Sequence, residues 1–266
     1  MHIIVCIKQV PDPEGPPDSF VINEVLNRVE PRGIPPVLSL FDENALEAAL
    51  RLKESSAEPV KISVLSVGRH ISKALILKAL AAGADEFFKV EDERFLTDSH
   101  DSHATASVIV SSIRNMGEYD LILTGRQSAD WNGGQTGIGI ASLLGIPVVT
   151  LARTVEIVSN TAFVKRVSPD GHELVRVPLP ALVMTSNEIG MLRYPTMLER
   201  RNAAKKSVTA WDTDDIGFVP VQALTVLKKL GKPQSRERRC RIIEGVSPAA
   251  AAKNLVSQLR ADLVIS

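Results

Sequence analysis

Residues 125–137 read Gly125-Arg126-Gln127-Ser128-Ala129-Asp130-Trp131-Asn132-Gly133-Gly134-Gln135-Thr136-Gly137. The apolar run Leu121-Ile122-Leu123 precedes them, and residues 138–145 predict a short helix that ends at a glycine. Together these segments predict a buried parallel strand, a glycine-rich polar turn and a helix start. Backbone N–H groups and the positive end of the helix dipole point into such a turn. We therefore expect a nucleotide or phosphate group at the carboxyl edge of a parallel sheet.

The same turn has a purely structural interpretation. Strand-to-helix turns favour glycine, and Thr or Asn caps the helix that follows. The segment matches neither the dinucleotide-binding fingerprint nor the Walker P-loop. The residues alone therefore leave both a nucleotide site and a structural turn open.

Strands and helices alternate around this turn, which is typical of a doubly wound, mostly parallel α/β sheet of the Rossmann-like kind. The expected strands are 2–7, 60–67, 86–90, 121–123, 147–152 and 181–185, and the expected helices are 42–54, 72–82, 104–116 and 138–145. Residues 154–158, 161–167 and 173–178 predict an added antiparallel hairpin with a turn at 168–171. A helix is also expected within 186–206.

Two segments fall outside this alternation. Residues 8–36 are rich in proline and predict a long excursion without regular structure, which is usually functional or covers a partner. Residues 212–247 lack periodicity and lead to a final helix at 248–260, so we expect a C-terminal extension that docks on another chain. The predicted division is an α/β domain over 1–211 and an arm over 212–266. Asp42 is the expected N-cap of the first helix.

Composition excludes several classes of function. The 266 residues are 44% hydrophobic and carry 31 basic and 31 acidic side chains. This balance argues against broad electrostatic binding to nucleic acid or an anionic membrane. No apolar run reaches the roughly 18 residues of a membrane span, and no leader is evident, so we expect a cytoplasmic protein without direct membrane insertion. Cys6 and Cys240 have no metal-binding spacing.

Catalytic motifs are scarce, and we predict no catalytic residue and no metal site. His100 and His103 beside Asp98 and Asp101 could bind a metal, but a polar helix entrance is favoured. The basic cluster 236–241 fits an acidic partner surface or solvated charge equally well. A binding or carrier role is therefore favoured over a stand-alone enzyme, and any chemistry would belong to a cofactor.

Several blocks in order resemble the beta subunit of electron transfer flavoproteins. The blocks are Val5-Cys6-Ile7-Lys8-Gln9-Val10-Pro11-Asp12, residues 41–53, Ala79-Leu80-Ala81-Ala82-Gly83-Ala84-Asp85, residues 121–127, Val177-Pro178-Leu179-Pro180-Ala181-Leu182-Val183-Met184-Thr185 and Arg193-Tyr194-Pro195-Thr196-Met197-Leu198. The resemblance implies a heterodimer with an alpha subunit that holds most of a redox FAD. Electrons arrive from a dehydrogenase, such as acyl-CoA dehydrogenase, and leave to a quinone reductase or other acceptor.

The resemblance also implies a structural AMP in the beta subunit. Its phosphate is expected at Gly125, Gln127, Asp130, Asn132, Gly134, Gln135 and Thr136, and its adenosine near Cys6, Ser39, Phe41, Asp42 and Val67. Electron-bifurcating members instead hold a second FAD there, use NADH as donor and carry Asp-Gly-Asp-Thr-Ala-Gln-Val-Gly in this turn. The Gln135-Thr136-Gly137 ending resembles the AMP-binding kind, whereas residues 101–105 resemble bacterial members that include bifurcating ones. We expect AMP, with a second FAD or an empty site as alternatives.

Three departures from the family pattern matter. Ser39-Leu40 stands where Asn-Pro is usual. The partner-recognition loop near 186–198 is one residue shorter and lacks Asn-Glu-Pro, so Ile189, Met191 or Leu192 is the candidate apolar anchor. The aromatic residue that touches the flavin has no clear equivalent, with Phe20 the nearest candidate.

Two other classes of nucleotide-binding protein fit the sequence less well. A pyrophosphatase-type ATP hydrolase needs a Ser-Gly-Gly-x-Asp-Ser loop after the first strand, and the chain has Lys8-Gln9-Val10-Pro11-Asp12 instead. A nucleotide sensor of the universal-stress kind is usually near half this length and lacks the C-terminal extension.

Overall fold

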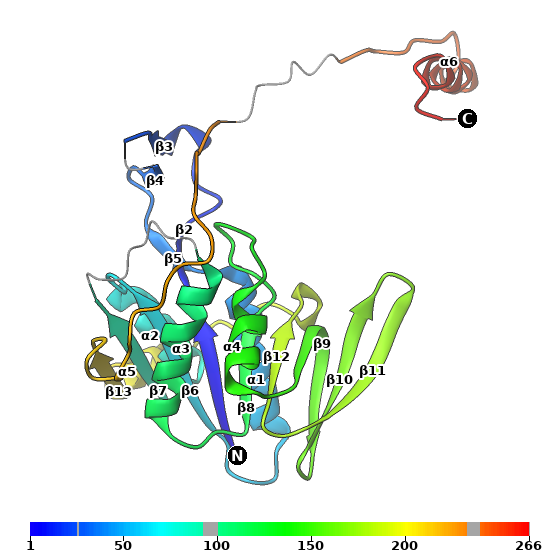
Figure 1. Ribbon diagram of the computed structural model, residues 1–266. Helices are drawn as coiled ribbons and strands as arrows, with labels where there is room; N and C mark the ends of the chain where they lie inside the picture. The colour runs from blue at the N-terminus through cyan, green and yellow to red at the C-terminus, as the bar shows by residue number, and fades with distance from the viewer. Residues whose placement is uncertain (26, 93–100, 233–239, 266) are drawn as a thin grey trace. The chain divides into compact units, whose positions relative to one another are not determined.

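A computed structural model describes residues 1–25, 27–92, 101–232 and 240–265. The described chain separates into two units, Met1–Leu230 and Gly231–Ser266. The first unit holds a nine-stranded sheet in the order β11-β10-β9-β12-β8-β1-β6-β7-β13 (Figure 1). Its strands are β1 (His2–Ile7), β6 (Lys61–Gly68), β7 (Glu86–Glu91), β8 (Leu121–Gly125), β9 (Val148–Val158), β10 (Thr161–Ser168), β11 (Gly171–Pro178), β12 (Ala181–Thr185) and β13 (Ser207–Trp211).

Helices cover both faces of this sheet, as expected for a doubly wound α/β fold. The helices of this unit are α1 (Leu40–Ser55), α2 (Lys73–Ala82), α3 (Ser102–Met116), α4 (Thr136–Leu144) and α5 (Met197–Ala203), with short 3-10 turns η1 (Pro17–Ser19) and η2 (Asn187–Ile189). In Figure 1, α3 and α4 lie in front of the sheet, and α1 lies behind it. The prediction of a mostly parallel α/β sheet with an added antiparallel hairpin is therefore confirmed.

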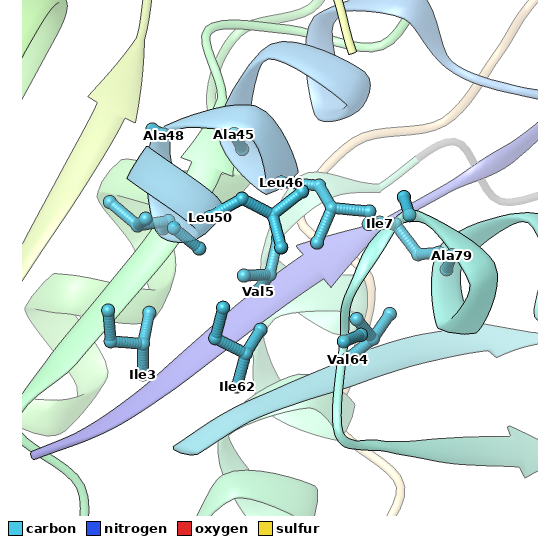
Figure 2. Packing of buried hydrophobic residues seen from close by; sticks show 14 of the residues in the cluster. Ile3, Val5, Ile7, Ala45, Leu46, Ala48, Leu50, Ile62, Val64 and Ala79 are labelled. Atoms are coloured by element: carbon cyan, nitrogen blue, oxygen red, sulfur yellow. The ribbon is translucent and has the colours of Figure 1, made fainter. Parts of the chain in front are cut away.

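β1 is the centre of two apolar cores because its residues alternate between the two faces. Ile3, Val5 and Ile7 pack with Leu46 of α1 and Val64 of β6 (Figure 2). Ile4 and Cys6 face the other way, into a core formed with α3 and α4. This double burial explains the unbroken apolar sequence of the strand.

Three sequence predictions about individual elements were wrong, and one strand was missed. The excursion 8–36 contains two antiparallel pairs, β2 (Gln9–Pro11) with β5 (Pro36–Leu38) and β3 (Phe20–Asn23) with β4 (Arg28–Pro31). Strand β13 was missed at the sheet edge, where it pairs with β7. The two strands expected at 147–152 and 154–158 are one strand, β9. Asp42 is not the N-cap of α1, because the helix begins two residues earlier and Ser39 is its N-cap.

β9 is continuous because a local irregularity lets it change partners. Its first half pairs in parallel with β12, and its second half pairs antiparallel with β10. Leu151 adopts a φ of +57°, and the register shifts in both pairings. A bulge of this kind bends a strand and lets two pairing directions meet in one chain segment.

Within the first unit, the segment 212–230 makes hydrogen bonds to the side chains of Asp92, Asp101 and Asn27. The Asp101 carboxylate accepts the backbone N–H groups of Leu224 and Thr225 at 2.9 and 2.7 Å. The Asn27 side chain donates to the Leu227 carbonyl at 2.9 Å and accepts from the Leu230 N–H at 2.8 Å. In the second unit, α6 (Pro248–Ala261) buries none of its residues.

Candidate functional site

The carboxyl ends of β1 and β8 form the topological switch point of the sheet. The chain runs from β1 to β6 and β7 on one side and then returns to β8 on the other side of β1. Crossovers therefore leave this edge in opposite directions, and ligands of doubly wound folds bind at such a position. The glycine-rich stretch follows β8 directly, so the structure brings residues 125–136 to this switch point.

Asp42 joins the two strand ends at the switch point. Its carboxylate accepts the Lys8 N–H at 2.8 Å and the Gly125 N–H at 3.2 Å. Asp42 is buried, and the loss of hydration raises the pKa of its carboxyl to about 7. The two N–H bonds lower this pKa, but their effect is smaller than that of burial. A buried carboxyl that satisfies two backbone donors fixes the spacing of the strands and so the shape of the site.

The loop between β8 and α4 is organised by hydrogen bonds and an ion pair, one between two predicted phosphate ligands and the others to residues outside the loop. Gln127 Nε2 donates to Asn132 Oδ1 at 2.8 Å, and Asp130 pairs with the Lys8 ammonium at 2.7 Å. Gln135 Oε1 accepts from the Ser102 hydroxyl at 2.8 Å. The Ala129 N–H lies 3.3 Å from the Ser39 hydroxyl, which accepts it. The predicted residues are thus brought together, and several hold the loop in shape.

Close backbone approach at this loop depends on glycine. A Cβ at Gly125 would lie 2.5 Å from Asp42 Oδ1 and 2.6 Å from the Phe41 carbonyl carbon. A Cβ at Gly137 would lie 2.8 Å from Thr124 Oγ1, and Gly134 adopts a φ of +65°. Substitution at any of these three positions is therefore strained.

The donors of the loop suit an anionic ligand. Gln135 at the N-cap position of α4 makes no side-chain capping bond, so the first-turn N–H groups have no side-chain acceptor there. The Arg126 guanidinium lies 4.8 Å from the Phe41 ring centroid, and its Nε is buried with no hydrogen-bond partner in the described residues. A helix amino end, a cation and a glycine cradle are what a nucleotide phosphate requires, so the residues fit the nucleotide predicted from the sequence.

Two predicted adenosine contacts lie on strand ends beside this loop. Cys6 is buried near the end of β1, and half-buried Val67 lies near the end of β6, both on the α3–α4 face. Burial, with a further contribution from the Asp42 charge, raises the pKa of the Cys6 thiol to about 12. The thiol is therefore neutral and offers an apolar surface rather than a nucleophile.

Comparison with known proteins identifies the family. A model of the electron transfer flavoprotein domain matches residues 28–216. This chain belongs to the electron transfer flavoprotein family. A beta subunit from Clostridium acetobutylicum is 35% identical over 216 residues, covering 81% of this chain and 80% of that protein. The chain is therefore a beta-type electron transfer flavoprotein subunit.

Two relatives with other names match over most of their length. The caffeyl-CoA reductase–Etf complex subunit CarD of Acetobacterium woodii is 31% identical and covers 100% of both chains. Protein FixA of Bradyrhizobium diazoefficiens is 31% identical over 95% of this chain and 89% of its own. The similarity therefore extends beyond the segment that the family model matches.

Residues 186–198, where the sequence predicts a partner-recognition loop, lead from β12 into the first turn of α5 and are here called the docking loop. Of the three anchor candidates, Ile189 and Leu192 are buried, whereas Met191 is 80% exposed. Tyr194, Met197 and Leu198 are exposed beside it. The structure therefore leaves Met191 as the candidate that can reach a partner without unfolding the loop. Phe20, the candidate flavin neighbour, is half-buried at the start of β3.

Sequence reasoning missed several residues of the site. Contacts across the fold come from Lys8, Ser102 and Arg126. The positive charges of Lys8 and Arg126 beside the two strand ends could have indicated these two residues, whereas Ser102 has no such signal. Within the described residues, no cluster of His, Cys, Asp or Glu side chains is placed to hold a metal. His100, Asp98 and the basic residues 236–239 lie outside the described residues. None of the described helices is long and apolar enough to cross a membrane.

Proposed function

We propose that this chain is the beta subunit of a heterodimeric, cytoplasmic electron transfer flavoprotein that holds one structural AMP at the switch point. In this proposal the alpha subunit holds most of the FAD. Electrons pass from a dehydrogenase, such as acyl-CoA dehydrogenase, to a quinone reductase or another acceptor. FAD, when bound, accepts and donates electrons singly or in pairs, and this chain supplies binding surfaces rather than acid–base groups.

The observation that carries the nucleotide proposal is the close backbone packing at Gly125 and Gly137, where a side chain would not fit. We call this pair of glycines the cradle. The first turn of α4 and the Arg126 side chain supply donors for a phosphate, and the loop contacts hold those donors in place. Cys6, Val67 and Phe41 offer apolar surface to an adenosine. The same donors also suit the diphosphate of a second FAD, so ligand identity needs a direct measurement.

The test is the nucleotide content of this chain co-expressed with its alpha subunit. The purified complex is denatured, and released FAD and AMP are quantified by chromatography per heterodimer. One FAD and one AMP is the expected result. Two FAD without AMP would overturn the AMP proposal in favour of an electron-bifurcating protein that takes electrons from NADH. One FAD alone would mean that this chain binds no nucleotide, and failure to form a flavin-containing complex would overturn the heterodimer.

Met191 is proposed to anchor a redox partner. Replacing it with alanine is expected to raise the KM of an acyl-CoA dehydrogenase assay for the complex about tenfold with kcat unchanged, because exposed apolar anchors carry much of an interface's binding energy. The matched control is Leu174→Ala on β11, which removes a 75% exposed leucine that is not part of the docking loop. Equal KM values for the two variants would contradict the role of Met191.

Basic side chains of α5 and of the residues after it, which follow the docking loop in the sequence, add a second expectation. Arg200, Arg201 and Lys205 are exposed, and the described residues show no ion pair to any of them. An acidic partner surface would therefore meet unpaired cations. We expect the KM to rise with ionic strength between about 50 and 300 mM salt, because exposed charge pairs are screened over roughly 10 Å. A salt-independent KM would exclude this electrostatic contribution.

A further inference from the structure

The docking loop rests on a stripe of polar side chains along α1. Asn44, Glu47, Arg51 and Glu54 follow one another at spacings of three or four residues, so they lie on one face of the helix. A neighbouring face of the helix contributes Leu46 and Leu50 to the apolar core (Figure 2). The same helix begins beside the nucleotide loop, where Ser39 and Asp42 make their contacts.

Arg193 of the docking loop is held by Glu47 through three hydrogen bonds. Its Nε donates to Glu47 Oε2 at 3.0 Å, its Nη2 donates to Oε1 at 3.0 Å, and its backbone N–H donates to Oε2 at 3.2 Å. Glu54 also accepts from the same guanidinium, and Arg51 Nε donates to Glu47 Oε1 at 3.0 Å. The paired, fork-shaped contact fixes both the side chain and the backbone of Arg193.

A second contact holds the loop three residues earlier. Asn44 Nδ2 donates to the Gly190 carbonyl at 2.5 Å. Gly190 adopts a φ of +109°, and a Cβ there would lie 2.7 Å from Arg51 Nη2. The loop backbone is therefore fastened to α1 on both sides of Met191.

Glu47 is an ionised group in a buried position, which makes the contact costly to break. It is only 4% exposed. Burial raises the pKa of its carboxyl, but hydrogen bonds from Arg193 and Arg51 outweigh burial and leave the pKa below its ordinary value. Removing one partner of a buried pair leaves the other charge buried and unpaired. Loss of Arg193 is therefore expected to destabilise the loop more than loss of a surface ion pair would.

The consequence of these contacts is a division of the loop into buried and exposed side chains. Ile189 and Leu192 are fixed in the core, while Met191 and Tyr194 are 80% and 87% exposed. Two neighbouring apolar side chains are thus held in water by polar bonds to a helix. Ordering such a loop in advance removes a cost that a partner would otherwise meet on binding.

We propose that Glu47 and Arg193 are positioning residues, a latch that holds the docking loop on α1 in one conformation before a redox partner binds. The use of this ordered loop rests on the proposed function of the loop as a partner surface. The latch itself is a property of this chain and can be measured without a partner.

Amide hydrogen exchange in the co-expressed alpha–beta complex tests the latch. In Arg193→Gln we expect residues 188–194 to exchange at least about tenfold faster, because a charge-assisted hydrogen bond network is lost. Arg193→Lys, which keeps the charge but not the fork, should lie between this variant and the wild type. The amides of β1 and β8 serve as an internal reference and should keep their wild-type rates. Arg166→Ala is the matched control, since it removes an exposed pair with Glu173.

Unchanged exchange in the docking loop would overturn the latch. Equal acceleration in the loop and in β1 and β8 would also overturn it, because the arginine would then stabilise the whole fold rather than the loop. A second readout is the KM of the acyl-CoA dehydrogenase assay, which should rise in Arg193→Gln with kcat unchanged. Faster loop exchange together with an unchanged KM in both Arg193→Gln and Met191→Ala would support the latch and overturn the proposed docking role.

Discussion

Replacing Gly125 with alanine is expected to remove the nucleotide from the purified complex and to lower the free energy of unfolding by about 3 kcal/mol. The added methyl would lie 2.5 Å from Asp42 Oδ1 and 2.6 and 2.7 Å from the Phe41 carbonyl carbon and oxygen. Two of these three atoms are backbone atoms of α1, so relief requires the helix or the end of β8 to move. Either movement shifts the loop that carries the expected phosphate contacts and separates the Gly125 N–H from Asp42.

Gly133→Ala is the matched control for this prediction. Gly133 lies in the same loop, and a Cβ there meets nothing within 4 Å. We expect a change in unfolding free energy within about 0.5 kcal/mol and a nucleotide content near that of the wild type. The measurements are urea unfolding of the complex at one protein concentration and chromatography of the released nucleotide. Full nucleotide content in Gly125→Ala would show that the cradle does not form the site.

The fold could be predicted because its signals are local. Strands such as β1 are buried on both faces and are therefore uniformly apolar, and Gly83 and Gly145 mark the ends of α2 and α4. The glycine-rich loop after β8 could be found for the same reason. The strands of the proline-rich segment 8–36 could not be predicted, because β2 and β5 are too short to show a hydrophobic periodicity.

The contacts that shape the site could not be predicted, because they join residues far apart in the sequence. Asp42 looks like a helix N-cap, yet its partners Lys8 and Gly125 lie 34 and 83 residues away. Glu47 and Arg193 are separated by 146 residues, and their pairing decides which docking-loop side chains are buried. The sequence alone did not distinguish Ile189, Met191 and Leu192, because all three are apolar. In the structure Ile189 and Leu192 are buried, and Met191 is exposed.

Asp42 is expected to make the stability of the protein depend on pH. Burial raises the pKa of its carboxyl from 3.8 to about 7 in the folded protein. Between about pH 4 and pH 7 the unfolded chain therefore loses this proton while the folded protein retains it. The unfolded state then binds fewer protons than the folded state, so stability falls as the pH rises, by about 1.4 kcal/mol per pH unit and by about 4 kcal/mol over the whole range.

Asp42→Asn isolates this contribution, because the amide has the same size but does not titrate. The amide can accept only one of the N–H groups of Lys8 and Gly125, so the variant should be less stable than the wild type at pH 5. The advantage of the wild type should shrink by about 1.4 kcal/mol per unit up to about pH 7 and then stay constant. Urea unfolding at a fixed concentration of the complex from pH 5 to pH 8 gives the difference in unfolding free energy between the variant and the wild type. For Gly133→Ala, which changes no titrating group, this difference should not depend on pH. A constant difference between Asp42→Asn and the wild type would mean that Asp42 is already ionised in the folded protein, so that the two N–H bonds outweigh the cost of burial.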